Sequence, residues 1–379
     1  MDYGLSEDDL MIKETAREFA RKRLVPNAMK YDEEDGIPGE LVEELAELGY
    51  LGMMLPEEFG GLELSTVSFV GALEEICSAC AGVGILISVQ NSLCCEIIHK
   101  YASDFLKKKY LPQMATGMVG SYCITEPNAG TDVSGIMTSA VEKGDHYLIN
   151  GTKTFVTNAG FAGIFIVFAV TDPSAGNKGI SCFAIDKDTP GISIGAPENK
   201  CGMRASDTRE VSFLDVKVPK ENMIGAPGQG FKMALSILNS GRIGVSFQAI
   251  GIARAALEEA IKYAKERKQF KQPIANFQAI QFKLADMATE IEAGRILAYR
   301  AAALKDEGKP IVREASMAKL FCSRMANFVV NEAVQIHGGY GYMKEYPVER
   351  YFRDARVTEL YEGTTEAQKM TIARDLLKE

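Results

Sequence analysis

The stretch Phe277-Gln-Ala-Ile280-Gln-Phe-Lys-Leu284-Ala-Asp-Met287-Ala-Thr-Glu-Ile291 decides the fold of the C-terminal part of this chain of 379 residues. Its apolar residues recur every three or four positions, a spacing that places them on one face of an α-helix. Gly308 and Pro310 predict the end of this helix, because glycine caps helices and proline cannot continue them. A long helix is predicted before it, over residues 238–270, ahead of Pro273. Long amphipathic helices with short connections indicate a helix bundle.

Upstream of this region the pattern changes twice. Between residues 118 and 227, short β-rich runs alternate with Gly, Pro, Asn and Asp clusters, whereas residues 1–117 show helical spacing. The sequence therefore predicts an α+β multi-domain fold. It consists of an N-terminal α-helical domain over 1–117, a middle small β-barrel or sandwich domain over 118–227, and a C-terminal four-helix-bundle domain over 228–379. The predicted strands are 121–124, 146–149, 154–157, 164–170, 180–185 and 210–216.

Composition excludes several classes of protein. The formal net charge is −9 and the densest basic run is only Lys107-Lys108-Lys109, so nucleic-acid binding is disfavoured. The N-terminus is acidic and lacks the order of a signal peptide. The longest uninterrupted apolar run, Ile164–Val170, is too short to span a bilayer. We expect a cytoplasmic protein without membrane insertion.

Known catalytic and metal-binding motifs are largely missing from the sequence. Cys77-Ser-Ala-Cys80 followed by Cys94-Cys95 resembles a zinc spacing, but it offers no second C-x-x-C pair, so no metal site is predicted. Neither the Rossmann glycine motif nor a P-loop occurs, and no histidine lies in a metalloprotease motif. An acid–base reaction by a carboxylate, assisted by an organic cofactor, remains open.

One carboxylate stands out near the C-terminus, in Tyr361-Glu362-Gly363-Thr364-Thr365-Glu366. Glycine allows a ligand to approach the backbone closely, and Thr-Thr-Glu predicts the start of a final helix. Glu362 should therefore lie at a turn above that helix, with its side chain free to face a ligand bound in the space above the helix. A capping turn with a solvated acid explains the same spacing.

Four further stretches have the composition of ligand-binding loops. Asn150-Gly151 predicts a hairpin turn, after which Phe155 and Thr157 share one face of a strand. Each stretch also has a structural explanation, as a turn, a core strand, a basic helix end or a glycine helix cap. The four are Tyr122–Asp132, Gly151–Gly160, Glu266–Phe270 and Gln335–Tyr342.

Taken together and in this order, these stretches resemble the acyl-CoA dehydrogenase family, most closely its short-chain, butyryl-CoA type. Gly202-Met203-Arg204-Ala205-Ser206 and Gly241-Arg242-Ile243-Gly244 extend the resemblance over essentially the whole chain. It implies an FAD-dependent oxidoreductase that converts an acyl-CoA to its 2,3-enoyl form. Glu362 would take the α-proton while the flavin accepts the β-hydride. The resemblance also implies a homotetramer that passes electrons to electron-transferring flavoprotein.

The resemblance assigns binding residues to positions of this chain. Arg267, Gln278 and Gln335–Gly339 would hold the adenosine diphosphate part of a neighbouring subunit's FAD. The implied substrate-binding residues are Thr131, Asn239, Arg242 and Gly363. The implied cofactor-binding residues are Tyr122, Cys123, Ile124, Thr125, Gly130, Thr131, Phe155, Val156, Thr157, Arg267, Phe270, Gln278, Gln335, Gly338, Gly339, Thr364 and Glu366.

Three positions depart from the family pattern: Phe155 where many relatives carry Trp, Lys271 where Gly is usual, and Asn239 where Asp is usual. Two alternatives stay open. One is a cyclic or aryl-propenoyl acyl-CoA dehydrogenase or enoyl-CoA reductase of the same superfamily. The other is a non-catalytic helical acyl-CoA-binding or scaffold protein. Acyl-chain or ring preference, direction and electron partner are left open by the residues.

Overall fold

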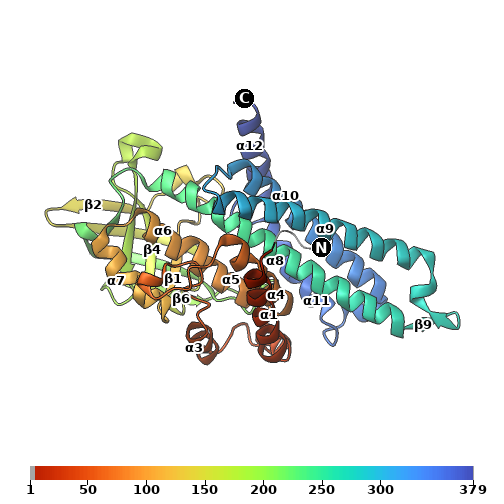
Figure 1. Cartoon of the computed structure of the whole chain (residues 1–379). Helices are drawn as coiled ribbons and strands as arrows, with labels where there is room; N and C mark the ends of the chain where they lie inside the picture. The colour runs from red at the N-terminus through yellow and green to blue at the C-terminus, as the bar shows by residue number, and fades with distance from the viewer. Residues whose placement is uncertain (1–4, 379) are drawn as a thin grey trace.

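The structure, a computed structural model, describes residues 5–378 (Figure 1). Its N-terminal region is helical, as predicted. The first helix begins after Ser6, whose hydroxyl and backbone N–H both exchange hydrogen bonds with Asp9, and this capping box fixes the helix start. The helices are α1 (Glu7–Phe19), α2 (Ala28–Glu33), α3 (Gly39–Glu47), α4 (Thr66–Ala79), α5 (Ala81–Ser88), α6 (Glu96–Tyr101) and α7 (Asp104–Ala115).

The run Ala81–Tyr101 joins α5, a π-helical segment and α6. Within residues 5–378 it is the one run long and apolar enough to cross a membrane, but 94% of its most apolar window is buried inside the protein. Its polar side chains bind backbone groups of other segments. Gln90 accepts a hydrogen bond from the Gly120 N–H at 2.7 Å, and Asn91 donates to the Tyr50 carbonyl at 2.8 Å. The run is therefore a core helix that anchors the first strand of the sheet.

The middle region is one eight-stranded sheet, seen at the left of Figure 1. Its order is β6-β7-β3-β2-β4-β5-β8, and β1 pairs in parallel with β4. The predicted strands fall on observed ones, although 121–124 runs one residue past the end of β1 and both 146–149 and 154–157 belong to the single strand β3. Strands β2, β6 and β8 were not predicted because their apolar alternation is weak. The strands are β1 (Val119–Cys123), β2 (Ser139–Lys143), β3 (His146–Thr157), β4 (Ala162–Val170), β5 (Ile180–Asp186), β6 (Ile192–Pro197), β7 (Thr208–Pro219) and β8 (Met223–Ile224).

The predicted hairpin turn at Asn150-Gly151 is wrong. The two residues lie inside β3, where the register with β7 shifts between Ile149 and Gly151, as in a β-bulge. The Asn150 side chain bonds Asp215 of β7 instead of closing a turn. Gly151 has φ 151°, and a Cβ there would lie 2.7 Å from the Thr138 Cα. The glycine thus serves close backbone packing rather than chain reversal.

The C-terminal region is a helix bundle, and Figure 1 shows α8, α9 and α10 extending together away from the sheet. Helix α8 begins at Gly230, earlier than predicted, where a Cβ would lie 2.8 Å from the Ile180 carbonyl oxygen of β5. Tight packing of this helix start on the sheet is a tertiary effect that propensity does not reveal. The helices are α8 (Gly230–Glu266), α9 (Gln278–Asp306), α10 (Val312–His337), α11 (Val348–Arg356) and α12 (Thr365–Leu376).

A buried ion network joins the two helical regions. Glu74 of α4 is 1% exposed, and its carboxylate lies 3.1 Å from Arg254 of α8 and 3.0 Å from Arg295 of α9. Lys13 of α1 adds a third cation at 3.3 Å. Burial alone would raise the pKa of Glu74, but these three cations together hold that pKa below its ordinary value. The network fixes how α4 sits across α8 and α9.

Candidate active site

Glu362 lies in the tight turn that precedes α12, as the sequence predicts. Thr364 is the N-cap residue of α12, and its hydroxyl accepts from the Ala367 N–H at 3.3 Å. Glu362 has φ 50° and Gly363 has φ 95°. A non-glycine residue in this left-handed region costs of order 1 kcal/mol or more, so surrounding groups must hold it there. The backbone N–H groups of Glu362 and Gly363 donate to no acceptor within residues 5–378.

The carboxylate of Glu362 points into the protein interior, against α8. A Cβ on Gly241 would lie 2.0 Å from Glu362 Oε2 and 2.9 Å from Leu93 Cδ2, so only glycine leaves room for this carboxylate. Both carboxylate oxygens are buried, and neither has a hydrogen-bond partner in the described chain. Burial raises the pKa of Glu362 to about 7, against the opposing effect of Lys319 and Arg242. A carboxyl group of this kind can exchange a proton near neutral pH.

Two buried cations lie close to this carboxylate. Arg242 of α8 donates to Asn239 Oδ1 at 2.9 Å and to the Ser316 hydroxyl at 3.2 Å, while its Nε is buried without a partner. Burial lowers the pKa of Arg242, and Glu362 partly opposes that effect. Lys319 of α10 is fully buried and donates to the Gly363 carbonyl at 2.7 Å. Desolvation lowers the pKa of Lys319 to about 8.

More buried polar atoms without partners surround the same turn. The Tyr122 hydroxyl on β1 is one, and the Thr365 hydroxyl at the start of α12 is another. Burial raises the pKa of Tyr122 well above its ordinary value, and the nearby Glu362 charge adds to that rise. Buried polar groups are nearly always paired, so a cluster of unpaired ones predicts a ligand that pairs with them.

The loop after β1 is held by a buried ion pair. Lys153 of β3 is 0% exposed and donates to Glu126 at 2.7 Å and to the Ile124 carbonyl at 3.2 Å. Glu126 in turn accepts from the backbone N–H groups of Met137 and Thr138 at 2.6 and 2.9 Å. The pair therefore fixes Ile124 and Thr125 beside β3. Further along this loop, Gly130 and Thr131 are exposed.

Phe155 sits at a second irregularity of β3, where the register with β7 shifts between Lys153 and Val156. It has φ 55° and is 67% exposed, while Val156 is buried and Thr157 is half-buried. Phe155 and Thr157 are thus both more exposed than Val156 between them. A large exposed aromatic side chain held in a strained conformation is what a ligand-facing position shows.

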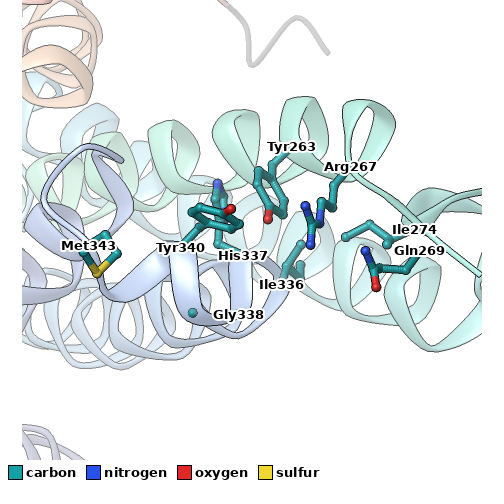
Figure 2. Close-up of a pocket in the computed structure, with 10 residues that line it drawn as sticks. Tyr263, Arg267, Gln269, Ile274, Ile336, His337, Gly338, Tyr340 and Met343 are labelled. Atoms are coloured by element: carbon teal, nitrogen blue, oxygen red, sulfur yellow. The ribbon is translucent and has the colours of Figure 1, made fainter.

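A second group of predicted residues lines a cavity of about 560 Å³ at the distal end of α8 (Figure 2). Arg267, Gly338 and Gly339 all contribute to it, so the structure unites parts of the third and fourth stretches. The His337 ring stacks on Tyr263 with centroids 4.2 Å apart, and Arg267 lies over the Tyr340 ring at 5.5 Å. Three other predicted residues, Phe270, Gln278 and Gln335, are exposed outside the lining of this cavity.

Phe270 and Lys271 form the turn of a two-stranded hairpin between β9 (Lys268–Gln269) and β10 (Gln272–Pro273). Their φ angles are 49° and 66°, and a two-residue turn with positive φ at both positions favours Asn and Gly. Lys271 therefore keeps the turn at a cost in backbone strain. Phe270, 88% exposed, projects from this hairpin.

Comparison with protein families matches nearly the whole chain. Residues 6–118 match the N-terminal domain of acyl-CoA dehydrogenase, residues 121–216 its middle domain, and residues 228–377 its C-terminal domain. The chain belongs to the acyl-CoA dehydrogenase family. Enzymes of this family are FAD-dependent oxidoreductases, so the family, fold and enzyme class predicted from sequence are confirmed.

Individual relatives support the same assignment. The chain is 45% identical to the short-chain specific acyl-CoA dehydrogenase of Clostridium acetobutylicum, over 100% of both chains. It is 44% identical to acryloyl-CoA reductase (NADH) of Anaerotignum propionicum, over 100% of this chain and 96% of the relative.

Solved structures agree with the relatives. Butyryl-CoA dehydrogenase from Megasphaera elsdenii is 46% identical, with a TM-score of 0.97 and 100% of both chains covered. A chain from the structure described as the electron transferring flavoprotein of Acidaminococcus fermentans is 47% identical, with a TM-score of 0.98 over 100% of both chains. A glutaryl-CoA dehydrogenase from Mycobacterium smegmatis in complex with FADH2 is 34% identical, with a TM-score of 0.94 and 99% and 96% of the two chains covered.

Sequence reasoning missed three groups in this acyl-CoA dehydrogenase. Lys319 looks like any lysine on an amphipathic helix, and no local signal reveals that it is buried beside the turn. Lys153 and Glu126 stood inside predicted loops, but their pairing across the sheet is a tertiary contact. The glycine at 241 was noticed as part of a motif, whereas its role in making room for the carboxylate needed the structure.

Proposed function

We propose that this enzyme dehydrogenates a short-chain acyl-CoA thioester to the 2,3-enoyl-CoA, using bound FAD, with Glu362 as the base that removes the α-proton. One observation carries the proposal. The Glu362 carboxylate is buried, unpaired and held on a strained turn, with a pKa raised to about 7. A solvated capping acid, or a scaffold protein without chemistry, needs none of these features.

Residues of the Glu362 turn, of β1 and of β3 fit a flavin. The unpaired Tyr122 and Thr365 hydroxyls offer hydrogen bonds, and exposed Phe155 and half-buried Thr157 offer an aromatic and a polar surface. The cofactor-binding residues named from sequence are proposed in that role, with Tyr122–Thr131, Phe155–Thr157, Thr364 and Glu366 near the flavin. When bound, FAD supplies the hydride acceptor that amino-acid side chains lack.

The charges around Glu362 determine how the proton is removed from the α-carbon. Glu362 takes the α-proton, and the C–H electron pair left behind forms the new double bond as the β-hydrogen departs with its own electron pair, for which bound FAD would be the acceptor. Negative charge develops on the thioester oxygen during this step, and hydrogen-bond donors aimed at it lower the barrier. The free backbone N–H groups of Glu362 and Gly363 are suitable donors, because they belong to the turn that also presents the base. Buried Arg242 favours the ionised base.

A short acyl chain is supported by packing beyond the base. One turn along α8, a Cβ on Gly244 would lie 2.4 Å from the Ser88 hydroxyl oxygen of α5. One turn further, Gln248 accepts a hydrogen bond from the Tyr361 hydroxyl. Close helix contact and this bridge restrict the space for a long alkyl tail on this side of Glu362. The implied contacts of Thr131, Asn239, Arg242 and Gly363 with acyl-CoA are part of the proposal.

The reverse direction is a second candidate, favoured by the 44% identity to an acryloyl-CoA reductase. A carboxyl group with a pKa of about 7 is protonated often enough to deliver a proton to the α-carbon of an enoyl thioester. Both directions use the same residues. Electron-transferring flavoprotein is proposed as the redox partner, and a cytoplasmic location is proposed with it.

The cofactor arrangement supports an oligomer. Gly241 and Arg267 stand about seven turns apart on α8, ~39 Å at about 1.5 Å per residue. One FAD cannot reach from Glu362 to the cavity at Arg267, so that cavity would hold the adenosine diphosphate part of another subunit's FAD. The large apolar side chains of Phe282 and Ile296 on α9 are 60% and 51% exposed, as a subunit interface requires. We propose the homotetramer on these grounds.

Glu362→Gln tests the proposal, because the amide keeps size and hydrogen bonding but cannot take a proton. We expect the purified variant to retain FAD colour and to lose turnover by ~10²–10⁴. Glu43→Gln, the same substitution at an exposed position on α3, is the matched control and should retain turnover. Initial rates with butyryl-CoA, longer acyl-CoA, cyclohexanoyl-CoA and the matching enoyl-CoA then identify chain length and direction. Near-normal dehydrogenation by Glu362→Gln contradicts the assignment of the base.

A further inference from the structure

Lys319 is the buried titratable group that the proposed reaction leaves without a defined role. It lies on α10 about two turns after the helix start, is 0% exposed, and forms no ion pair with any carboxylate in residues 5–378. An unpaired buried ammonium is costly to the fold, and such groups persist mainly where they act on a functional site. Within residues 5–378 its ammonium group makes one hydrogen bond, to the Gly363 carbonyl at 2.7 Å.

That carbonyl belongs to the turn that carries the base. Gln368 of α12 donates to the same carbonyl at 2.9 Å and to the Glu362 carbonyl at 3.2 Å. Lys319 and Gln368 together therefore hold both peptide oxygens of the Glu362-Gly363 pair. This arrangement maintains the positive φ angles and aims the free N–H groups and the carboxylate. Gln368 is neutral, so Lys319 alone adds a charge.

We propose that Lys319 is a positioning residue for the base: it fixes the Glu362-Gly363 turn and keeps Glu362 ionised at working pH. The inference rests on the proposed role of Glu362. Few charged groups other than Lys319 face the Glu362 carboxylate. Arg242 faces the carboxylate from α8, whereas the surrounding Leu93, Tyr122 and Tyr361 are uncharged at neutral pH.

The residue at position 239 makes the ionisation of Glu362 depend more strongly on Lys319 and Arg242. Arg242 is bonded to an amide, Asn239, rather than to a carboxylate, so its charge is not neutralised by that partner. Among the described residues Glu362 is then the acid that directly balances two buried cations, and Glu359 and Glu366 act on Lys319 from nearer the surface. The excess positive charge suits a site in which negative charge moves from the carboxylate to the thioester oxygen.

The test compares Lys319→Met with Gln368→Met in FAD-loaded enzyme. Both variants remove hydrogen bonds to the turn, but the first alone removes charge. The pH dependence of kcat/KM reports the ionisation of the free enzyme's base. We expect the acid limb of Lys319→Met to move upward by about one pH unit, and that of Gln368→Met to stay in place. Lys319→Arg, which keeps the charge, should restore the limb.

A second readout does not need turnover. In protein labelled with ¹³C at the glutamate carboxyl carbon, the Glu362 signal is assigned by its loss in Glu362→Gln and followed through a pH titration. The same upward movement is expected in Lys319→Met. Should that variant not fold, Lys319→Gln removes the charge while keeping a donor, and it must show the same change. The proposal is overturned if, in the folded variant, neither the acid limb of the kcat/KM profile nor the titration of the Glu362 carboxyl carbon differs from that of the parent enzyme.

The failure of this inference and of the proposed function are distinguishable. If Glu362→Gln keeps its turnover, the base is wrong and Lys319 has nothing to position. If Glu362→Gln is inactive and Lys319→Met titrates like the parent enzyme, the base stands and the role of Lys319 falls. Equal effects of Lys319→Met and Gln368→Met on kcat, without any change in the pH profile, mean a purely structural clamp, which also overturns the electrostatic role.

Discussion

The ionised Glu362 carboxylate should lower the free energy of unfolding of this protein. Its pKa is raised from 4.5 to about 7, because an ionised carboxylate is buried without hydrogen bonds. The folded state therefore holds this proton more tightly than the unfolded chain does. Stability falls as pH rises from the unfolded pKa through the folded one, and a difference of one in pKa between the two states corresponds to about 1.4 kcal/mol. Above the folded pKa the cost is ~3 kcal/mol.

Glu362→Gln removes this cost, since a neutral amide has no charge to desolvate. At about pH 8 we expect the variant to unfold with a free energy up to ~3 kcal/mol higher than the parent, by urea denaturation of the FAD-loaded enzyme. Well below the ordinary pKa of 4.5 the gain should vanish, because both proteins are then neutral at this position. Glu43→Gln, at an exposed position on α3, should leave the free energy of unfolding essentially unchanged at either pH. Equal stability of parent and Glu362→Gln at the higher pH would refute the buried, ionised carboxylate.

Four other predictions concern pH dependence, the ion network, the hairpin and the acyl site. In the parent enzyme kcat/KM should rise about tenfold between about pH 6 and pH 8 as Glu362 ionises; a flat profile would mean a base with an ordinary pKa. Glu74→Gln leaves buried cations without their acid and should cost ~3–5 kcal/mol of unfolding free energy, measured by urea denaturation; a loss below about 1 kcal/mol is the contrary result. Lys271→Gly relieves the strained turn and should raise that free energy by roughly 1 kcal/mol, and an unchanged or lower value is the contrary result. Gln248→Ala should raise the rate with hexanoyl-CoA relative to butyryl-CoA about tenfold, as a ratio of kcat/KM, and an unchanged ratio would locate the end of the acyl site elsewhere.

The sequence was sufficient where local chemistry decides the structure. The three-and-four spacing around Met287 and the glycine turn beside Glu362 both predicted what the structure contains. Local signals failed where a distant segment sets the outcome. Asn150-Gly151 has the composition of a hairpin turn, yet strand pairing with β7 and contact with Thr138 make it a bulge.

In the candidate site, too, the features set by adjacent residues could be predicted and those set by distant segments could not. The base and the glycine at 363 are adjacent in sequence, so their turn could be predicted, and the order of several loops led to the family. Lys319 comes 43 residues before the base and Gln90 lies on a different region, so only the folded chain reveals what they hold. Burial of a lysine is a property of its neighbours, and nothing in Met317-Ala318-Lys319-Leu320 records it.

The length of α8 also has a consequence for how well the enzyme retains FAD on dilution. If its two ends serve two different flavins, each prosthetic group is shared, and holding it becomes a collective property of the assembly. Mass action then links subunit dissociation to cofactor release, so that yellow colour and turnover should fade together below one threshold concentration. Free FAD should lower that threshold, and a protomer locked as a monomer should be colourless however well it folds.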